Sequence, residues 1–227
     1  MSAFTNNLLQ PSLLGNGLVG WWKMDEGQGL TAYDTSGKNK NGTLINSPAW
    51  TTGIKGNCLL FNGTGSCVEN TKGISISTIY TVTAWINPAD LLYVGHEAST
   101  YGGAIMASSG GSNNYPLWLT VYGTEIRIAS WEGSITLTPT SGSNLHVNNW
   151  YFISAVGVKG GNTSVYVNGI NRLSYTNHGQ LNWANEFCIG DVRLNRNISF
   201  NGKIDDVRIY NRALSQQEIT LLYNSYL

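Results

Sequence analysis

Charge is scarce in this sequence. Only 11% of the 227 residues are Asp, Glu, Lys or Arg, and the 13 basic residues balance 13 acidic ones. Proteins that bind nucleic acid usually carry a basic excess or a basic stripe, and neither is present. We therefore expect no nucleic-acid partner, and the polar surface must be built from Asn, Ser, Thr and Gly.

Long apolar runs are also missing. No stretch approaches the ~18 consecutive apolar residues of a membrane-spanning helix, so no membrane span is expected. The N-terminus, MSAFTNNLLQPSLLGNGLVG, lacks the basic start and apolar centre of a secretory signal peptide. If the protein acts outside the cell, either its signal is not part of this sequence or it reaches its site by another route.

Cysteine is rare, with three residues at positions 58, 67 and 188. An odd number leaves at least one thiol unpaired. Cys58 and Cys67 flank the turn sequence NGTG, but a turn at 62–65 places Leu60, not Cys58, opposite Cys67. We therefore favour three small buried apolar residues over a disulfide.

Glycine and aromatic residues, by contrast, are abundant, with 27 Gly, 8 Trp and 12 Tyr. Short runs rich in β-branched and aromatic residues alternate with polar positions between Gly, Asn and Pro, which is typical of strands. They predict strands at 18–24, 58–61, 66–69, 80–86, 116–122, 125–131, 150–158, 163–169, 186–192 and 203–210. Because strands and helices do not alternate, the pattern predicts an all-β antiparallel sandwich.

One helix is expected, at the C-terminus. Ser215 and Glu218 have the S-x-x-E spacing of a capping box. Apolar residues then recur at helical spacing, at Ile219, Leu222, Tyr223 and Tyr226. Such a helix would pack on the rim of the sandwich.

Six segments follow one another in an order that is specific in combination. They are GLVGWWKMDEGQGLTAYDTSGKNKNGTL, WTTGIKGNCLLFNGTGSCVE, YTVTAWINP, NNWYFISAVG, TSVYVNG and FNGKIDDVRIYNRALSQQEITLLY, and they span about residues 17–226. Together they resemble a laminin G-like domain of the concanavalin A-like lectin/glucanase superfamily. The resemblance implies a jelly-roll sandwich of two curved antiparallel sheets, with the first and last strands as neighbours. We expect this domain to cover residues 17–227, after an N-terminal extension at 1–16.

The resemblance does not decide the function, because such domains include glycan-binding modules, adhesion domains and some glycosidases. Glucanases of the superfamily carry carboxylates at alternate positions of one strand, on one face of the sheet. Glu125 and Glu132 are separated by an odd number of positions, and the adjacent Asp205 and Asp206 would point to opposite faces. We therefore expect no enzyme activity.

Asp205 occupies an unusual place in the last strand. Strict alternation puts it on the same inward face as Val207 and Ile209, where a lone carboxylate is costly. Glu26 would share an inward face with Trp22, and the resemblance places the first and last strands side by side. A calcium ion would relieve the repulsion between two inward carboxylates.

The loop at 33–42 adds further oxygen donors. The resulting hypothesis is a structural Ca²⁺ ion bound by backbone carbonyls and by some of Glu26, Asp34, Asn41 and Asp205. In the alternative, Asp205 accepts backbone N–H bonds or pairs with Lys203 or Arg208, and Asp34 forms an Asx-turn. Asp206 is expected to point outward and form a solvated ion pair with Arg208.

A sugar site needs a flat aromatic face and polar groups for the hydroxyls, and loops carry these most readily. The candidate ligand-binding residues are Tyr101, Tyr115, Trp131, His178 and Trp183. For Trp131 and Trp183, packing in the core or at the rim explains the aromatic residue equally well.

Two functions fit these observations. The first is a non-catalytic, lectin-like recognition or adhesion module that binds a glycan or polysaccharide and is stabilised by calcium. The second is a structural surface subunit, such as a virion decoration or fibre protein, that self-associates or joins a larger assembly. Both place the protein outside the cell or on a particle or virion surface. A glycosidase is a third option, disfavoured by the lack of paired carboxylates.

Overall fold

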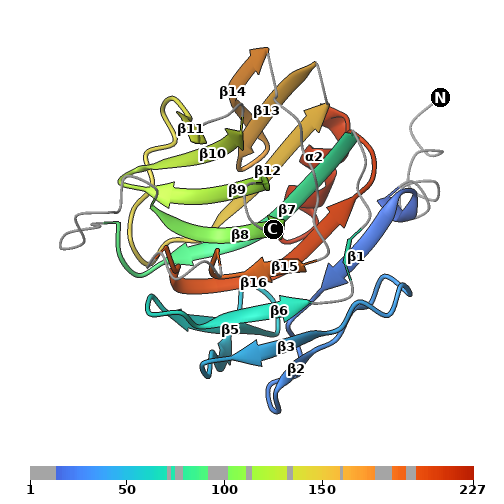
Figure 1. Cartoon of the computed structure of the whole chain (residues 1–227), viewed down its shortest axis with the longest axis vertical. Helices are drawn as coiled ribbons and strands as arrows, with labels where there is room; N and C mark the ends of the chain where they lie inside the picture. Colours follow the sequence, from blue (N-terminus) through green and yellow to red (C-terminus); the bar gives the residue numbers. More distant parts are fainter. Residues whose placement is uncertain are drawn as a thin grey trace, which may run out of the picture.

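The computed structural model describes residues 14–70, 73–74, 79–91, 102–110, 114–131, 135–158, 161–176, 186–192 and 198–227. Two antiparallel sheets form a sandwich, and a C-terminal helix lies beside it (Figure 1). The predicted fold class is therefore confirmed. Among the described residues, no helix has the length and apolar character needed to cross a membrane.

The first sheet contains the longest strands of the protein. Its order is β14 (Ile170–Thr176), β13 (Asn162–Val167), β12 (Tyr151–Val158), β7 (Ile79–Pro88), β16 (Asn201–Tyr210), β5 (Asn57–Asn62) and β4 (Ala49–Thr52). An eighth strand, β1 (Leu18–Trp22), also pairs with β16. The first and last strands are thus neighbours, as the resemblance implied.

The second sheet faces the first across the core. Its order is β11 (Ile135–Pro139), β10 (Glu125–Trp131), β9 (Asn114–Tyr122), β8 (Gly103–Gly110), β15 (Glu186–Ile189), β6 (Cys67–Asn70), β3 (Gly42–Ile45) and β2 (Thr31–Ala32). The predicted strands all lie within or overlap observed ones. The strands β2, β3, β4, β8, β11 and β14 were not predicted.

The main core is formed by the inward side chains of both sheets. Trp22 of β1 stacks on Phe187 of β15 with ring centroids 5.5 Å apart, which joins the two layers. The three cysteines are buried and form no disulfide, as expected. Burial of many large apolar side chains is the main source of stability in such a sandwich.

A second apolar cluster lies on the outer face of the first sheet, beneath helix α2 (Gln216–Asn224). Ile219 and Leu222 of the helix are buried against Trp85 of β7 and Phe152 of β12. Trp85 also stacks on Tyr223, with ring centroids 5.7 Å apart. The helix therefore covers the face of the first sheet that is turned away from the core.

The predicted capping box is present at the start of α2. The Glu218 amide donates to Ser215 Oγ at 3.3 Å, and the Ser215 amide donates to Glu218 Oε2 at 2.9 Å. Arg212 adds a salt bridge to Glu218 at 2.6 Å. These contacts, with the Arg212 bond as the largest contribution, lower the pKa of Glu218.

Replacing Ser215 with Ala should lower the free energy of unfolding by about 1 kcal/mol, because an N-cap side chain satisfies an amide that otherwise lacks a partner. Urea denaturation would measure the change. Gln217→Ala, at an exposed position of the same helix, is the matched control and should have little effect. An S215A variant as stable as the parent would show that the cap contributes nothing.

Candidate functional site

Two adjacent carboxylates of β16 lie where the strand has no hydrogen-bonded neighbour among the described strands along one edge. Strand β5 pairs with β16 as far as Ile204, and β1 pairs with it from Val207 onward. Asp205 and Asp206 lie in the gap between these two partner strands. The edge of β16 is therefore open there to groups from loops and from the C-terminal helix.

Asp206 forms a β-bulge in this gap. The register between β16 and β7 shifts directly after Asp205, and Asp206 has a φ of 44°. A bulge inserts one extra residue and reverses the alternation of side chains beyond it. The expectation that Asp205 shares a face with Val207 and Ile209 is therefore wrong: those two lie in the core, whereas Asp205 lies opposite Trp85 on the helix-covered face.

Asp205 is buried, with 1% of its surface exposed. Its Oδ2 accepts the Ile54 N–H at 3.0 Å, and its Oδ1 accepts the Asp206 N–H at 2.8 Å. Burial raises the pKa of Asp205 to about 8, and the charges of Asp206 and Asp25 add to the rise, whereas the two N–H donors oppose it. A Cβ at Gly53 would collide with Asp205 Oδ2, so the neighbouring loop closes directly onto the carboxyl.

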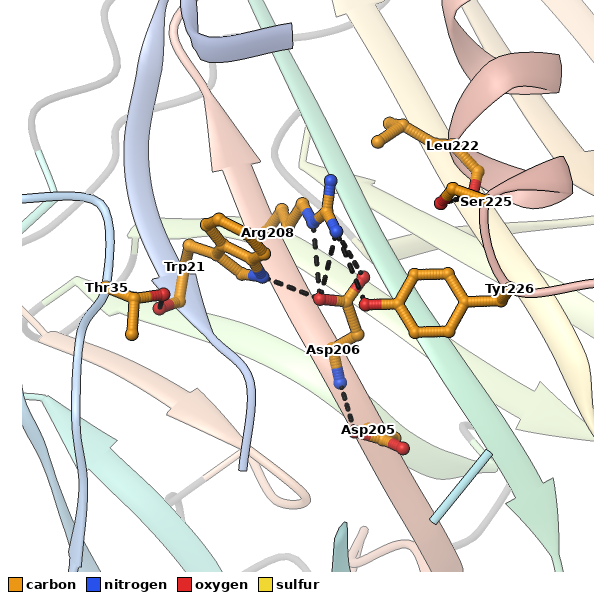
Figure 2. A network of polar contacts seen from close by, with 8 residues as sticks. All are labelled: Trp21, Thr35, Asp205, Asp206, Arg208, Leu222, Ser225 and Tyr226. Atoms are coloured by element: carbon orange, nitrogen blue, oxygen red, sulfur yellow. Dashed lines mark hydrogen bonds and ion pairs between the residues drawn. The ribbon is translucent and has the colours of Figure 1, made fainter. Parts of the chain in front are cut away.

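Asp206 lies at the centre of a polar network shown in Figure 2. It forms a salt bridge of 3.0 Å with Arg208, and it accepts a hydrogen bond of 2.6 Å from the Trp21 indole. Arg208 donates to the Tyr226 hydroxyl at 3.4 Å. Its guanidinium also lies over the Trp21 ring, 4.3 Å from the centroid.

The Asp206–Arg208 pair was expected to be solvated, and that expectation is wrong. Asp206 is 2% exposed and Arg208 is 8% exposed, because Trp21 from β1 and Tyr226 from the C-terminus cover them (Figure 2). Burial alone would lower the pKa of Arg208, but the Asp206 carboxylate outweighs it and raises that pKa. Arg208 therefore stays charged, and its salt bridge with Asp206 is buried.

A pocket of about 310 Å³ opens above this network. We call it the Asp205 pocket; it is lined by Trp21, Lys23, Asp25, Lys55, Gly56, Asp205, Arg208, Ser225 and Tyr226. Asp205 and Arg208 are its buried floor, and Trp21 and Tyr226 are half-buried walls. Asp25 and Lys55 are exposed at its mouth. Aromatic walls with polar groups between them suit a small polar ligand that has apolar faces.

Four residues of the pocket were not predicted as site residues: Trp21, Lys23, Lys55 and Tyr226. The two adjacent tryptophans at positions 21 and 22 are the signal in the sequence from which Trp21 could have been predicted. Adjacent residues of a strand point to opposite faces, so only one of the two could enter the core. Trp22 is fully buried there, and Trp21 faces the pocket.

The predicted sugar-binding residues remain predictions. Tyr101, His178 and Trp183 lie outside the described residues. Tyr115 lies in β9 and Trp131 ends β10, and only their backbone positions are described. The structure therefore neither gathers these five side chains nor separates them.

The four residues predicted to bind calcium do not form one site. Asp34 Oδ1 accepts the amides of Trp21 and Ser36, and its Oδ2 accepts the Ser36 hydroxyl and the Lys40 amide, each at 2.9 Å. Burial would raise the pKa of Asp34, but these hydrogen bonds outweigh it and lower that pKa. Asn41 Oδ1 is occupied as well, by the Asp34 amide at 3.0 Å.

The other two predicted ligands are placed differently. Glu26 Oε1 accepts the Tyr33 amide at 2.9 Å, and Asp205 lies in its pocket on the outer face of the first sheet. Within the described part of the chain, no group of three or more His, Cys, Asp or Glu residues could hold a metal ion. Asp34 therefore acts in an Asx-turn and Asp205 accepts backbone amides, as the alternative interpretation had it. A calcium ion bound by some of these residues together with backbone carbonyls stays a prediction.

Asp34→Ala should destabilise the protein by about 2–3 kcal/mol, because its carboxylate accepts hydrogen bonds that hold the loop at 35–40 against β1. The loss should be equal in calcium and in EDTA, measured by thermal denaturation. Lys38→Ala, in the same loop and exposed, is the control. A parent protein that melts at a lower temperature in EDTA would contradict this assignment and revive the calcium hypothesis.

Asp205→Asn should change how stability depends on pH. Folded Asp205 keeps its proton until about pH 8, whereas the unfolded residue loses it near 3.8. Its stabilising contribution is therefore complete below pH 3.8 and is lost as the pH rises to about 8, by at most about 1.4 kcal/mol per pH unit. The stability of D205N relative to the parent should improve across that range in urea titrations.

Asp25→Asn is the matched variant for this titration. Removing the charge of Asp25 lowers the pKa of Asp205, so the pH-dependent loss should persist and end at a lower pH. Parallel stability profiles for D205N and the parent would show that Asp205 is ionised in the folded protein throughout.

Three solved structures illustrate how widely this architecture occurs. Domain 4 of AbnA, a GH43 extracellular arabinanase from Geobacillus stearothermophilus, was solved in complex with arabinotriose. It is 23% identical, has a TM-score of 0.67 and covers 91% of this chain and 98% of its own. The binding domain of Paraclostridial Mosquitocidal Protein 1 is 21% identical, with a TM-score of 0.72. The match covers 94% of this chain and 53% of the toxin domain.

The botulinum neurotoxin serotype D ligand binding domain, solved in complex with N-acetylneuraminic acid, is 17% identical and has a TM-score of 0.72. The match covers 95% of this chain and 52% of the toxin domain. The chain thus spans about half the length of the two toxin domains. At these identities the likeness shows the fold alone.

A search of curated protein sequences found no match. The sequence does, however, match the model of one protein family over residues 62–220, which is more than half of its length. The order of the strands, the sandwich and this match agree, and the chain belongs to the concanavalin A-like lectin/glucanases superfamily, in its Laminin_G_3 family.

Proposed function

We propose that this protein is a non-catalytic, lectin-like module that binds carbohydrate. The observation that carries the proposal is the Asp205 pocket, in which the rings of Trp21 and Tyr226 form two walls beside charged and hydroxyl groups. Sugars are bound through apolar contacts of their rings with aromatic side chains and through polar contacts of their hydroxyls. The pocket offers both kinds of contact.

The solved relatives support the same class of ligand. The arabinanase domain was solved with arabinotriose, and the serotype D toxin domain with N-acetylneuraminic acid. A glycan-binding module of this kind would act outside the cell or on the surface of a particle.

A non-catalytic role is proposed because the two adjacent aspartates of β16 make other contacts. Asp206 is bound in a salt bridge with Arg208. Both oxygens of Asp205 accept backbone amides. Glycosidases need one carboxyl group to deliver a proton and a second carboxylate, ~5–10 Å away, to act as nucleophile or base. Because Asp206 is paired with Arg208 and does not line the pocket, Asp205 lacks a second catalytic carboxylate from its own strand.

The test is binding of the purified protein to an array of glycans that includes arabino-oligosaccharides and sialylated glycans. Reproducible binding to one class of glycan is expected, and Tyr226→Ala should weaken it about tenfold through loss of the aromatic contact. Tyr33→Ala is the control, because Tyr33 is an exposed aromatic residue outside the pocket.

Two results would contradict the proposal. A blank array would exclude carbohydrate binding and turn attention to a structural surface subunit, for which light scattering would measure self-association. Release of reducing sugar from a bound glycan would contradict the non-catalytic role. Repeating the array in EDTA would show whether binding depends on a metal ion.

A further inference from the structure

The mouth of the Asp205 pocket carries more basic than acidic side chains. Arg208 pairs with Asp206 and Arg212 pairs with Glu218, whereas neither Lys23 nor Lys55 forms a salt bridge with a described residue. Both lysines line the pocket. Their ammonium groups are therefore available to a ligand.

Each of these ammonium groups lies near an aromatic wall. Lys23 Nζ is 4.6 Å from the centroid of the Trp21 ring, and Lys55 Nζ is 5.8 Å from that of Tyr226. A cation–π contact of this kind holds an ammonium group near the ring without neutralising its charge. The two lysines thus border the pocket beside the two surfaces that a sugar ring would contact.

The acidic residues of the site do not cancel this charge. The Asp206 charge is compensated by Arg208. Asp205 is buried, and both of its oxygens accept amides. Asp25 remains as the acidic residue at the mouth, and its Oδ1 already accepts the Asn57 amide at 3.1 Å. Two ammonium groups therefore face one carboxylate, and the mouth favours an anion.

Size and polarity restrict the anion further. A volume of about 310 Å³ is at the lower end of pockets that hold small ligands. Between the aromatic walls, hydroxyl-bearing ligands can meet the Ser225 hydroxyl and the second oxygen of Asp25. A bare inorganic anion would leave the aromatic walls unused, whereas a neutral sugar would leave the ammonium groups unused.

Building on the proposed carbohydrate-binding function, we infer that the Asp205 pocket binds a sugar unit that carries a carboxylate, such as a uronic acid. The carboxylate lies between Lys23 and Lys55, and the ring packs against Trp21 or Tyr226. The hydroxyls reach Asp25 and Ser225. The preference arises from the unmatched ammonium groups, because a neutral sugar makes the same ring contacts without pairing them.

The test compares glucuronic acid oligosaccharides with glucose oligosaccharides of equal length by titration calorimetry. The uronate should bind at least about tenfold more tightly, and Lys23→Ala and Lys55→Ala should each weaken its binding about tenfold. Rising salt should also weaken it, because the interaction is between charges near the surface. Lys38→Ala removes an exposed lysine from the loop at 35–40, outside the pocket, and should leave the affinity unchanged.

The outcomes separate this inference from the proposed function. Binding of neutral glycans with no preference for the uronate, or equal loss in K38A, would overturn the inference and leave carbohydrate binding intact. Equal affinity for a sulfated glucose oligosaccharide would overturn the choice of a carboxylate. No binding to any glycan in the array would overturn the proposed function, and the inference with it. Circular dichroism of each variant checks that it is folded.

Discussion

The site depends on one extra residue in the last strand. Strict alternation back from Val207 and Ile209 would place Asp205 in the core, where its carboxyl group would have no polar partner. With the bulge, the apolar residues keep their place in the core and both aspartates reach the outer face. Asp tolerates the required positive φ better than most residues, which suits the residue found there.

The buried Asp206–Arg208 pair joins parts of the chain that are far apart in sequence. Trp21 from the first strand donates to Asp206, and Tyr226 from the C-terminus receives a hydrogen bond from Arg208. Burying an ion pair costs solvation, which is recovered only when additional hydrogen bonds satisfy both partners. The network therefore favours one arrangement of strand, bulge and helix end, and that arrangement defines the walls of the pocket.

Much of the fold could be predicted from the sequence, because alternation and capping are local signals. Apolar and polar residues alternate clearly in the strands around Trp85 and Phe152. The cap at Ser215 was predicted from its S-x-x-E spacing with Glu218. The strand β8 was missed because GAIMASSG has small residues and no contrast between faces, and β2 to β4 are too short to show a period. The bulge was missed because it is a property of pairing: only the register with β7 reveals that alternation breaks after Asp205.

The same reasoning explains why the predicted site and the observed pocket differ. The sequence pointed to loops rich in aromatic residues, whereas the pocket is built from the end of β1, the middle of β16, one short loop and the residues after helix α2. Rigid elements hold binding groups more accurately than loops do. The sandwich fixes where the pocket lies, but the balance of charge within it decides which ligand fits. That balance depends on Asp206 being matched by Arg208, while Lys23 and Lys55 face the single carboxylate of Asp25.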